Sequence, residues 1–140
     1  MIVPCFNEEK SISIFYDEVI KVINEIKDKI DKSLTYEFIF IDDGSKDRTS
    51  ETVKTLRNLD KNVNLIKFAR NFGKEAGILA GLKASKGKAV VLMDVDLQDP
   101  PNLIKKMYQI WFNKEAKIIY AKRNKRTDEK LIKSQIYYQM

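Results

Sequence analysis

Short apolar runs alternate with helical patterns along the whole chain, and this alternation limits the possible folds more than any other feature. Runs that favour strands cover residues 1–4, 36–41, 65–69, 89–93 and 117–121. A long amphipathic helix is expected over residues 12–30, where apolar residues recur at three- and four-residue steps. Further helices are expected over residues 49–59, 74–84 (rich in small residues), 101–112 and 128–140. This order predicts an α/β fold, with an open, mostly parallel sheet and helices on both faces.

Polar clusters follow the expected strands. In open parallel sheets, ligands bind at the carboxyl ends of the strands. The loops 4–8, 42–45, 70–74 and 94–98, together with residues 122–123, should therefore meet along one edge. Their convergence is stronger evidence for a binding site than any one of them alone.

The segment from residue 89 to residue 101 carries the most suggestive cluster. Asp94, Asp96 and Gln98 are spaced two apart, so in an extended chain their side chains would project to the same side. Two carboxylates this close repel unless a cation or a proton lies between them. The pattern favours a divalent-cation site, although loop aspartates also make turns and helix caps.

Two further loops have both a structural and a functional interpretation. In the loop 42–45, Asp42 and Asp43 precede Gly44, which suits a turn leading into a capped helix. A doublet at a strand end also suggests that one of the two side chains binds a base N–H or a ribose hydroxyl. In the loop 4–8, Asn7 is expected to cap the first helix, and Glu8 suits its first turn.

Basic residues lie at the other strand ends. Arg70 and Lys74 flank a glycine just before an expected helix N-terminus, where phosphate is favoured, although both could be solvated surface cations. Arg123 could hold a phosphate or stack on a base, or be a surface arginine. Residues 114–133 carry eight basic and three acidic residues, hence five of the six net positive charges. An anionic partner or a solubilising charged face would explain this bias.

Composition excludes several classes of site. The chain has no histidine and one cysteine, so it lacks the residues for Ser-His-Asp hydrolysis, for histidine-ligated zinc and for an intrachain disulfide. Any metal must then be bound by oxygen ligands, which favours Mg²⁺ or Mn²⁺. The glycine fingerprints of NAD-binding and P-loop proteins are absent, and no apolar stretch reaches the length of a membrane span or a signal peptide. At 140 residues, a single domain is expected.

Four motifs occur in order: Pro-x-Phe-Asn-Glu-Glu, Ile-Asp-Asp-Gly-Ser-x-Asp-x-Thr, Ala-Arg-Asn-Phe-Gly-Lys-Glu-Ala and Leu-Met-Asp-Val-Asp-Leu-Gln-Asp-Pro-Pro. Together they resemble the catalytic domain of family 2 glycosyltransferases, over essentially the whole chain. More narrowly, they resemble the branch of dolichol-phosphate mannosyltransferases and bactoprenol glucosyltransferases.

The resemblance implies a GT-A fold, a nucleotide-sugar donor, a polyprenyl-phosphate acceptor and no nucleic-acid partner. It places Asp94 at the donor, and Asp96 with Gln98 at the metal on the diphosphate. Arg70 and Lys74 would lie near the diphosphate and sugar, with Arg123 near the phosphates. The base and ribose pocket would be lined by Pro4, Phe6, Glu8 and Asp43, with Asp42 as a further candidate. Phe6 stands where tyrosine is common in the family.

Family members also continue well beyond the position of residue 140, often into transmembrane helices. The resemblance therefore implies that residues 1–140 are a soluble catalytic fragment of a longer protein, anchored at the cytoplasmic face of the cell membrane. A homo-oligomer is a further possibility. UDP-glucose or a related UDP-sugar is the expected donor, from the bactoprenol-type resemblance alone.

The expected reaction is inverting transfer, with Asp96 and Arg123 as the catalytic residues because both would stabilise the leaving diphosphate. A lipid phosphate is already anionic and needs no strong base as acceptor, whereas a sugar hydroxyl in cell-envelope polysaccharide would need one. Three alternatives use the same residues differently. They are a response-regulator receiver with Asp94 as phosphoacceptor, a phosphatase of the haloacid-dehalogenase type, and a nucleotide-binding scaffold without activity.

Overall fold

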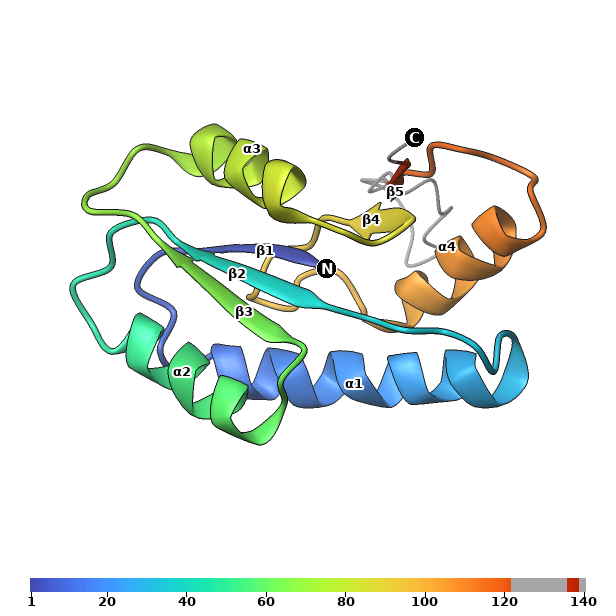
Figure 1. Ribbon diagram of the computed structural model, residues 1–140, viewed down its shortest axis with the longest axis horizontal. Helices are drawn as coiled ribbons and strands as arrows, with labels where there is room; N and C mark the ends of the chain where they lie inside the picture. The colour runs from blue at the N-terminus through green and yellow to red at the C-terminus, as the bar shows by residue number, and fades with distance from the viewer. Residues whose placement is uncertain (122–135, 139–140) are drawn as a thin grey trace, which may run out of the picture.

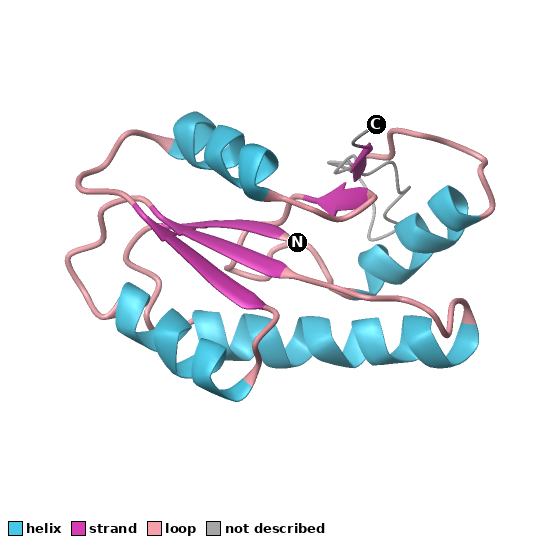
Figure 2. Cartoon of the chain, in the orientation of Figure 1, coloured by secondary structure: helices cyan, strands magenta, loops and turns pink. Residues whose placement is uncertain are grey.

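The computed structural model describes residues 1–121 and 136–138. Strands and helices alternate through these residues, as the sequence predicts (Figure 2). The elements are β1 (Ile2–Cys5), α1 (Ile12–Lys29), β2 (Phe38–Asp42), α2 (Thr49–Leu59), β3 (Val63–Lys67), α3 (Lys74–Ala84), β4 (Ala89–Val91), α4 (Asn102–Phe112) and β5 (Ile136–Tyr138).

Strands β1, β2 and β3 form a parallel sheet with β2 in the middle. The segment that follows β4 runs beside β1, where Leu92 forms a parallel bridge with Ile2 and the Met93 amide donates to the Ile2 carbonyl at 3.2 Å. β5 pairs with β4 in antiparallel orientation. The mostly parallel α/β arrangement is thus confirmed, and the carboxyl ends of β1, β2 and β3 lie at one edge.

Helices cover both faces of the sheet (Figure 1). On one face, the apolar stripe of α1, including Phe15 and Val19, packs with Val3, Phe38 and Phe40 of the strands. Burying each such side chain contributes about 1.5–3 kcal/mol, so this layer is the main source of stability. On the other face, the alternate strand residues Ile2, Ile39 and Ile41 lie beneath α3. A Cβ on Gly81 would lie 2.6 Å from Ile2 Cγ2, so only glycine allows this close approach.

Half-buried tyrosine–aspartate contacts tie the helices together at the other end of the sheet. Tyr16 of α1 and Tyr36 both donate to Asp60 Oδ2, at 2.6 and 2.8 Å. Tyr108 of α4 donates to Asp31 Oδ2 at 2.6 Å. These bonds fix α1 against the end of α2 and against α4. Within the described residues, no helix combines the length and the apolarity that crossing a bilayer requires.

Two predicted elements are wrong and two strands are displaced. The strand expected over residues 36–41 is Phe38–Asp42, and that expected over 65–69 is Val63–Lys67. Residues 117–121 form no strand, because β5 takes the position beside β4 and Ile119 instead packs with Leu103 and Met107. The helix expected over 128–140 is replaced at residues 136–138 by β5, where isoleucine and two tyrosines favour a strand. The rest of that prediction lies outside the described residues.

Candidate functional site

The loops after β1 and β2 are joined by reciprocal hydrogen bonds. The Asn7 amide donates to Ser45 Oγ at 2.8 Å, and the Lys46 amide donates to Asn7 Oδ1 at 2.9 Å. The Glu8 amide donates to Thr49 Oγ1 at 2.9 Å. Asn7 has a φ of 52°, a left-handed conformation that asparagine tolerates better than most residues. The expectation that Asn7 caps α1 is therefore wrong, because its side chain holds the neighbouring loop instead.

Asp42 has a structural role in the turn after β2. It is 1% exposed, and its Oδ1 accepts a hydrogen bond from the Ser45 amide at 2.8 Å. Its Oδ2 accepts a hydrogen bond from the Ser50 hydroxyl of α2. The contacts match the turn interpretation of the aspartate doublet. As a substrate ligand Asp42 remains only a prediction, since both of its carboxylate oxygens have partners within the protein.

Asp43 joins the turn after β2 to the loop before α3. Its Oδ1 accepts a hydrogen bond from the Phe72 amide at 2.7 Å, and its Oδ2 accepts one from the Gly73 amide at 3.0 Å. Gly44 packs so closely against this loop that a Cβ there would lie 2.5 Å from the Arg70 carbonyl carbon. Three loops at the carboxyl edge of the sheet are thus interlocked.

A pocket of about 120 Å³ opens between these loops. Its lining brings together five of the residues predicted from the sequence, Pro4, Phe6, Asp43, Lys74 and Asp94. Lys74 Nζ lies 2.6 Å from Asp94 Oδ1. The walls therefore combine apolar surface with an ammonium and two carboxylates. These are groups that can accommodate a base, hydroxyl groups and phosphate.

Four other residues line the pocket and were not predicted: Cys5, Ile41, Gly73 and Gly77. Gly73 and Gly77 are four residues apart, and this small-residue spacing around the start of α3 was the available signal. The Cys5 thiol donates to the Val3 carbonyl at 3.3 Å. Burial, reinforced by the nearby carboxylates of Asp42 and Glu8, raises the pKa of Cys5 well above its ordinary value. The thiol is thus a structural apolar group rather than a nucleophile.

Among the described residues, Arg70 and Glu8 were predicted at the site but do not line this pocket, and neither do Asp42, Asp96 and Gln98. The Arg70 guanidinium lies over the Phe72 ring, 4.2 Å from its centroid, and so makes a cation–π contact. Glu8 is half-buried beside the loop contact with Thr49. Arg123 lies outside the described residues. Any role of Arg70 or Glu8 at a ligand would require the ligand to extend beyond the pocket.

Asp96 and Gln98 lie in a turn rather than in an extended strand. β4 ends at Val91, and Leu97 adopts a left-handed φ of 58°. The Gln98 amide donates to Asp96 Oδ1 at 3.2 Å. The extended geometry expected here is wrong, and Asp94, Asp96 and Gln98 are all exposed.

The donor set around Asp96 fits a hard cation in part. Among the described residues, no group of three or more histidine, cysteine, aspartate or glutamate side chains is placed to hold a metal. Mg²⁺ is commonly bound by one or two carboxylates together with substrate phosphates, and it keeps several waters. Asp94 already pairs with Lys74, which leaves Asp96 as the carboxylate of the doublet for such a site. Asp96 is exposed, so its carboxylate is accessible to a hydrated cation.

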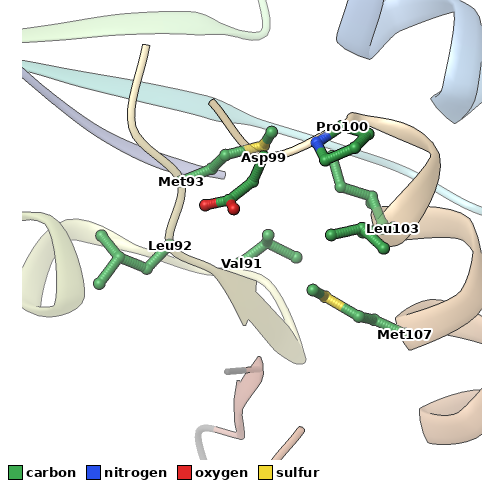
Figure 3. A pocket seen from close by; sticks show the side chains of 8 residues that line it. Val91, Leu92, Met93, Asp99, Pro100, Leu103 and Met107 are labelled. Carbon is green, nitrogen blue, oxygen red and sulfur yellow. The ribbon is translucent and has the colours of Figure 1, made fainter. Parts of the chain in front are cut away.

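A second, smaller cavity of about 50 Å³ lies between the end of β4 and the start of α4. Asp99 directs its carboxylate into the space beside Val91 and Met93, and Leu103 and Met107 are among the α4 residues that line it (Figure 3). This cavity shares no lining residue with the pocket that contains Lys74. Asp99 thus belongs to the packing of the turn onto α4.

Comparison with known proteins gives a consistent result. The model of the family described as glycosyl transferase family 2 matches residues 1–137. An uncharacterised glycosyltransferase of Bacillus subtilis strain 168, YkcC, is 40% identical over 136 residues, which are 96% of this chain and 40% of the relative. A prophage bactoprenol glucosyl transferase homologue of Escherichia coli K12 is 40% identical over 133 residues, covering 95% of this chain and 41% of the relative.

Solved structures share the fold at lower identity. TarS of S. aureus, residues 1–349, superposes with a TM-score of 0.66 at 22% identity, covering 97% of this chain and 45% of that one. The mannosyltransferase PcManGT of Pyrobaculum calidifontis, in complex with GDP-Man and Mn²⁺, superposes with a TM-score of 0.56 at 24% identity. The match covers 74% of this chain and 30% of that one. The GT-A fold is confirmed. The chain spans about 40% of the length of the curated relatives it matches.

Proposed function

The chain belongs to glycosyl transferase family 2, and we propose that it carries the donor site of an enzyme that transfers a sugar from a nucleoside diphosphate to a polyprenyl phosphate. The single observation that supports this most is the pocket at the carboxyl edge, where Lys74 and Asp94 form an ion pair beside Pro4, Phe6 and Asp43. With the family established, the receiver and phosphatase alternatives are set aside.

The donor would enter with its base toward the apolar wall formed by Pro4 and Phe6. Lys74 opens α3, so its ammonium and the first amides of the helix offer positive charge to the diphosphate. Asp94 can accept hydrogen bonds from ribose or sugar hydroxyls. One TarS structure contains UDP, and the relatives named bactoprenol glucosyl transferase are about 40% identical, so UDP-glucose is the donor we expect.

Mg²⁺ or Mn²⁺ would be bound by Asp96, with the side chain of Gln98 as a further oxygen ligand. When bound, such a cation supplies positive charge to the leaving diphosphate. The turn at Leu97 keeps the Asp96 carboxylate exposed and fixes its Oδ1 through the Gln98 amide. This arrangement supports a carboxylate that is presented to a ligand rather than used in packing.

The chemistry requires little from the protein beyond orientation and charge. A phosphate monoester is already anionic near neutral pH, so it can attack the anomeric carbon in line with the departing diphosphate and invert the configuration. Lys74 stabilises the negative charge that develops on the diphosphate. Arg123, which lies outside the described residues, remains our proposed second cation. Asp99, the nearest carboxylate after the turn, faces an apolar cavity, which fits a reaction without a general base on this segment.

The acceptor places the reaction at a membrane. A polyprenyl phosphate is anchored in a bilayer by its hydrocarbon chain, and nucleotide sugars are made in the cytoplasm, so we propose action at the cytoplasmic face. Residues 114–133, with five net positive charges, would favour an anionic surface. The relatives named bactoprenol glucosyl transferase support this class of acceptor.

A transfer assay tests the acceptor class. The protein is incubated with UDP-glucose labelled in the sugar and with undecaprenyl phosphate in detergent micelles. Label should move to the lipid phosphate, with release of one UDP for each sugar transferred. A parallel reaction with a cell-envelope polysaccharide tests the hydroxyl alternative. Transfer to the polysaccharide but not to the lipid phosphate would contradict the proposal.

A further inference from the structure

Helix α3 turns its two glycines, rather than its large apolar side chains, toward the sheet. Gly77 and Gly81 are its buried residues, and both lie against Ile41. Leu79 is two residues from each glycine, which places it on the opposite side of the helix, and it is 53% exposed. A surface helix normally buries its larger apolar residues and exposes polar ones. Packing among the described residues thus leaves the outward leucine of α3 half uncovered.

The loop before α3 exposes a second large apolar side chain. Phe72 is 53% exposed, and its ring meets the Phe68 ring edge-on, with 5.7 Å between the centroids. Phe68 packs with the apolar cluster on the sheet face that α3 covers. Phe72 therefore extends this face of the molecule, with the Arg70 guanidinium lying over its ring.

Exposed cations accompany these two side chains. Residues 70–88 comprise α3 and the turns on either side of it, and they contain one acidic residue, Glu75. Helices α1 and α2 cover the opposite face of the sheet and together carry five basic and five acidic residues (Figure 1). The α3 side is therefore basic where the other side is neutral. Five exposed basic residues lie in this range: Arg70, Lys74, Lys83, Lys86 and Lys88.

Most of this positive charge is not used within the fold. Lys74 pairs with Asp94, but the last three lysines of the range form no ion pair with another described residue. Glu37 offsets part of the charge, since its Oε1 accepts hydrogen bonds from the Lys86 amide at 2.6 Å and the Gly87 amide at 3.2 Å. These bonds also fix the turn that carries two of the lysines beside the end of α3.

We propose that the α3 side docks on an anionic phospholipid bilayer, with Phe72 and Leu79 at the boundary between headgroups and acyl chains and the cations on the headgroup phosphates. Exposed apolar side chains beside lysines are the combination that interfacial helices present to a membrane. Anionic lipids attract each such cation. A partner that offered phosphate alone would leave both apolar side chains in water.

This orientation would bring the donor pocket to the membrane. Gly73 and Lys74 line that pocket and lie between Phe72 and Leu79 in the sequence. A docked α3 would hold them beside the surface in which a polyprenyl phosphate is anchored. The docking itself goes beyond the proposed transfer reaction, because it requires neither a nucleotide nor a polyprenyl phosphate, and it involves other residues than 114–133.

Vesicle co-sedimentation tests the charges. The protein is mixed, without nucleotide, with vesicles of phosphatidylglycerol and phosphatidylcholine in equal parts or of phosphatidylcholine alone. The wild type should bind the anionic vesicles at least about tenfold more tightly, and Lys83→Glu/Lys88→Glu should lose about tenfold in this binding. Lys29→Glu/Lys54→Glu is the matched control, because it changes the net charge equally on α1 and α2, and it should lose less than about twofold.

Two results of this assay would overturn the inference. One is the absence of binding to the anionic vesicles by the wild type, and the other is an equal loss in the two double variants, which would mean that binding follows net charge alone. Lys83 and Lys88 do not line the pocket, so Lys83→Glu/Lys88→Glu should keep the UDP affinity of the wild type. Docking and the donor site are thus tested separately.

The apolar contribution is tested at Leu79. Leu79→Gln should weaken binding to the anionic vesicles about fivefold. Leu59→Gln is its control, since Leu59 is 83% exposed at the end of α2 on the other face, and it should bind as the wild type does. Wild-type binding by Leu79→Gln would indicate a polyanion, such as a nucleic acid, in place of a bilayer and would overturn the inference.

Tryptophan fluorescence provides a readout that does not depend on losing affinity. The emission of Leu79→Trp should shift to shorter wavelength when the anionic vesicles are added, whereas that of Leu59→Trp, with the same background from Trp111, should not. A shift in both variants or in neither would contradict docking through α3. A shift of Leu79→Trp that follows protein concentration without vesicles would mean that a second copy covers α3, and would also overturn the inference.

Discussion

Lys74 Nζ lies 2.6 Å from Asp94 Oδ1, so the first residue of α3 is paired with the first carboxylate after β4. The pair places an ammonium suited to phosphate and a carboxylate suited to hydroxyl groups in one pocket wall. Both side chains are about half exposed, at 55% and 49%. An exposed pair contributes little to stability, which is consistent with a role in binding rather than in folding.

Lys74→Gln should therefore weaken nucleotide binding without destabilising the fold. We expect the dissociation constant of UDP to rise about tenfold, because the diphosphate loses a charge-assisted contact. Lys105→Gln is the matched control, since Lys105 pairs with Glu25 at 3.2 Å and does not line the pocket. Calorimetric titration measures both. Similar affinities in the two variants would show that Lys74 does not contact the diphosphate.

The contact between the first two loops predicts a graded effect at Asn7. Asn7→Ala removes the acceptor for the Lys46 amide and places alanine at a φ of 52°. The free energy of unfolding should therefore fall by about 2 kcal/mol. Asn7→Gly also loses the hydrogen bond, but glycine adopts the left-handed backbone conformation without strain. The free energy of unfolding should therefore fall by about half as much as in Asn7→Ala. Urea denaturation gives both values. A larger loss in Asn7→Gly would contradict the argument from the backbone.

Two glycines of α3 should respond in opposite directions to alanine. At Gly81 a Cβ would lie 2.6 Å from Ile2 Cγ2, so Gly81→Ala must displace the helix and should destabilise the protein by about 1–3 kcal/mol. At Gly77 the nearest atom, Ile41 Cγ2, is 3.4 Å away, and Gly77→Ala should be stabilising by up to about 1 kcal/mol through helix propensity. Thermal unfolding of the two variants is the measurement, and equal effects would contradict the close packing at Gly81.

Asp60 should make stability depend on pH in the acid range. Burial opposes its charged form, but hydrogen bonds from Tyr16, the Asn62 amide and Tyr36 outweigh burial and hold the pKa of Asp60 below its usual value of 3.8. Because the pKa of Asp60 is lower in the folded than in the unfolded protein, the ionised carboxylate stabilises the folded state at pH values above the unfolded-state pKa. This stabilisation is lost as the pH falls through the folded-state pKa.

Asp60→Asn isolates this contribution. The difference in unfolding free energy between wild type and Asp60→Asn should be constant above about pH 5 and should shrink below about pH 4. Asp31 and Asp47 also have lowered pKa values, so the comparison with the variant is needed to separate Asp60 from them. A difference that stays constant down to pH 2 would contradict the pKa assignment.

Much of the fold was predictable because helix and strand periodicities differ and each segment is consistent with one of them. The prediction was wrong at residues 117–121 and 136–138, where an apolar branched run does not by itself specify whether it pairs or packs. The residues around Ile119 and Tyr137 do not specify that Ile119 packs against α4 or that Tyr137 pairs with β4. Choice of partner is a tertiary property, and short runs leave it undecided.

The position of the site was predictable, but the use of its polar groups was not. Parallel strands bring their carboxyl ends together, and five predicted residues do line one pocket. Asp42 and Asp43 are adjacent and chemically identical, yet one holds its own turn and the other holds the next loop. Hydrogen-bond direction depends on loop geometry, which spacing along the sequence does not specify.

The most direct test is calorimetric titration of the protein with UDP and GDP, with and without Mn²⁺, repeated on Asp96→Ala. We predict that at least one nucleotide binds with millimolar or tighter affinity, that Mn²⁺ strengthens this binding, and that Asp96→Ala removes the effect of Mn²⁺ while leaving the fold intact. Binding of neither nucleotide by the wild-type protein would contradict the donor site at the carboxyl edge of the sheet.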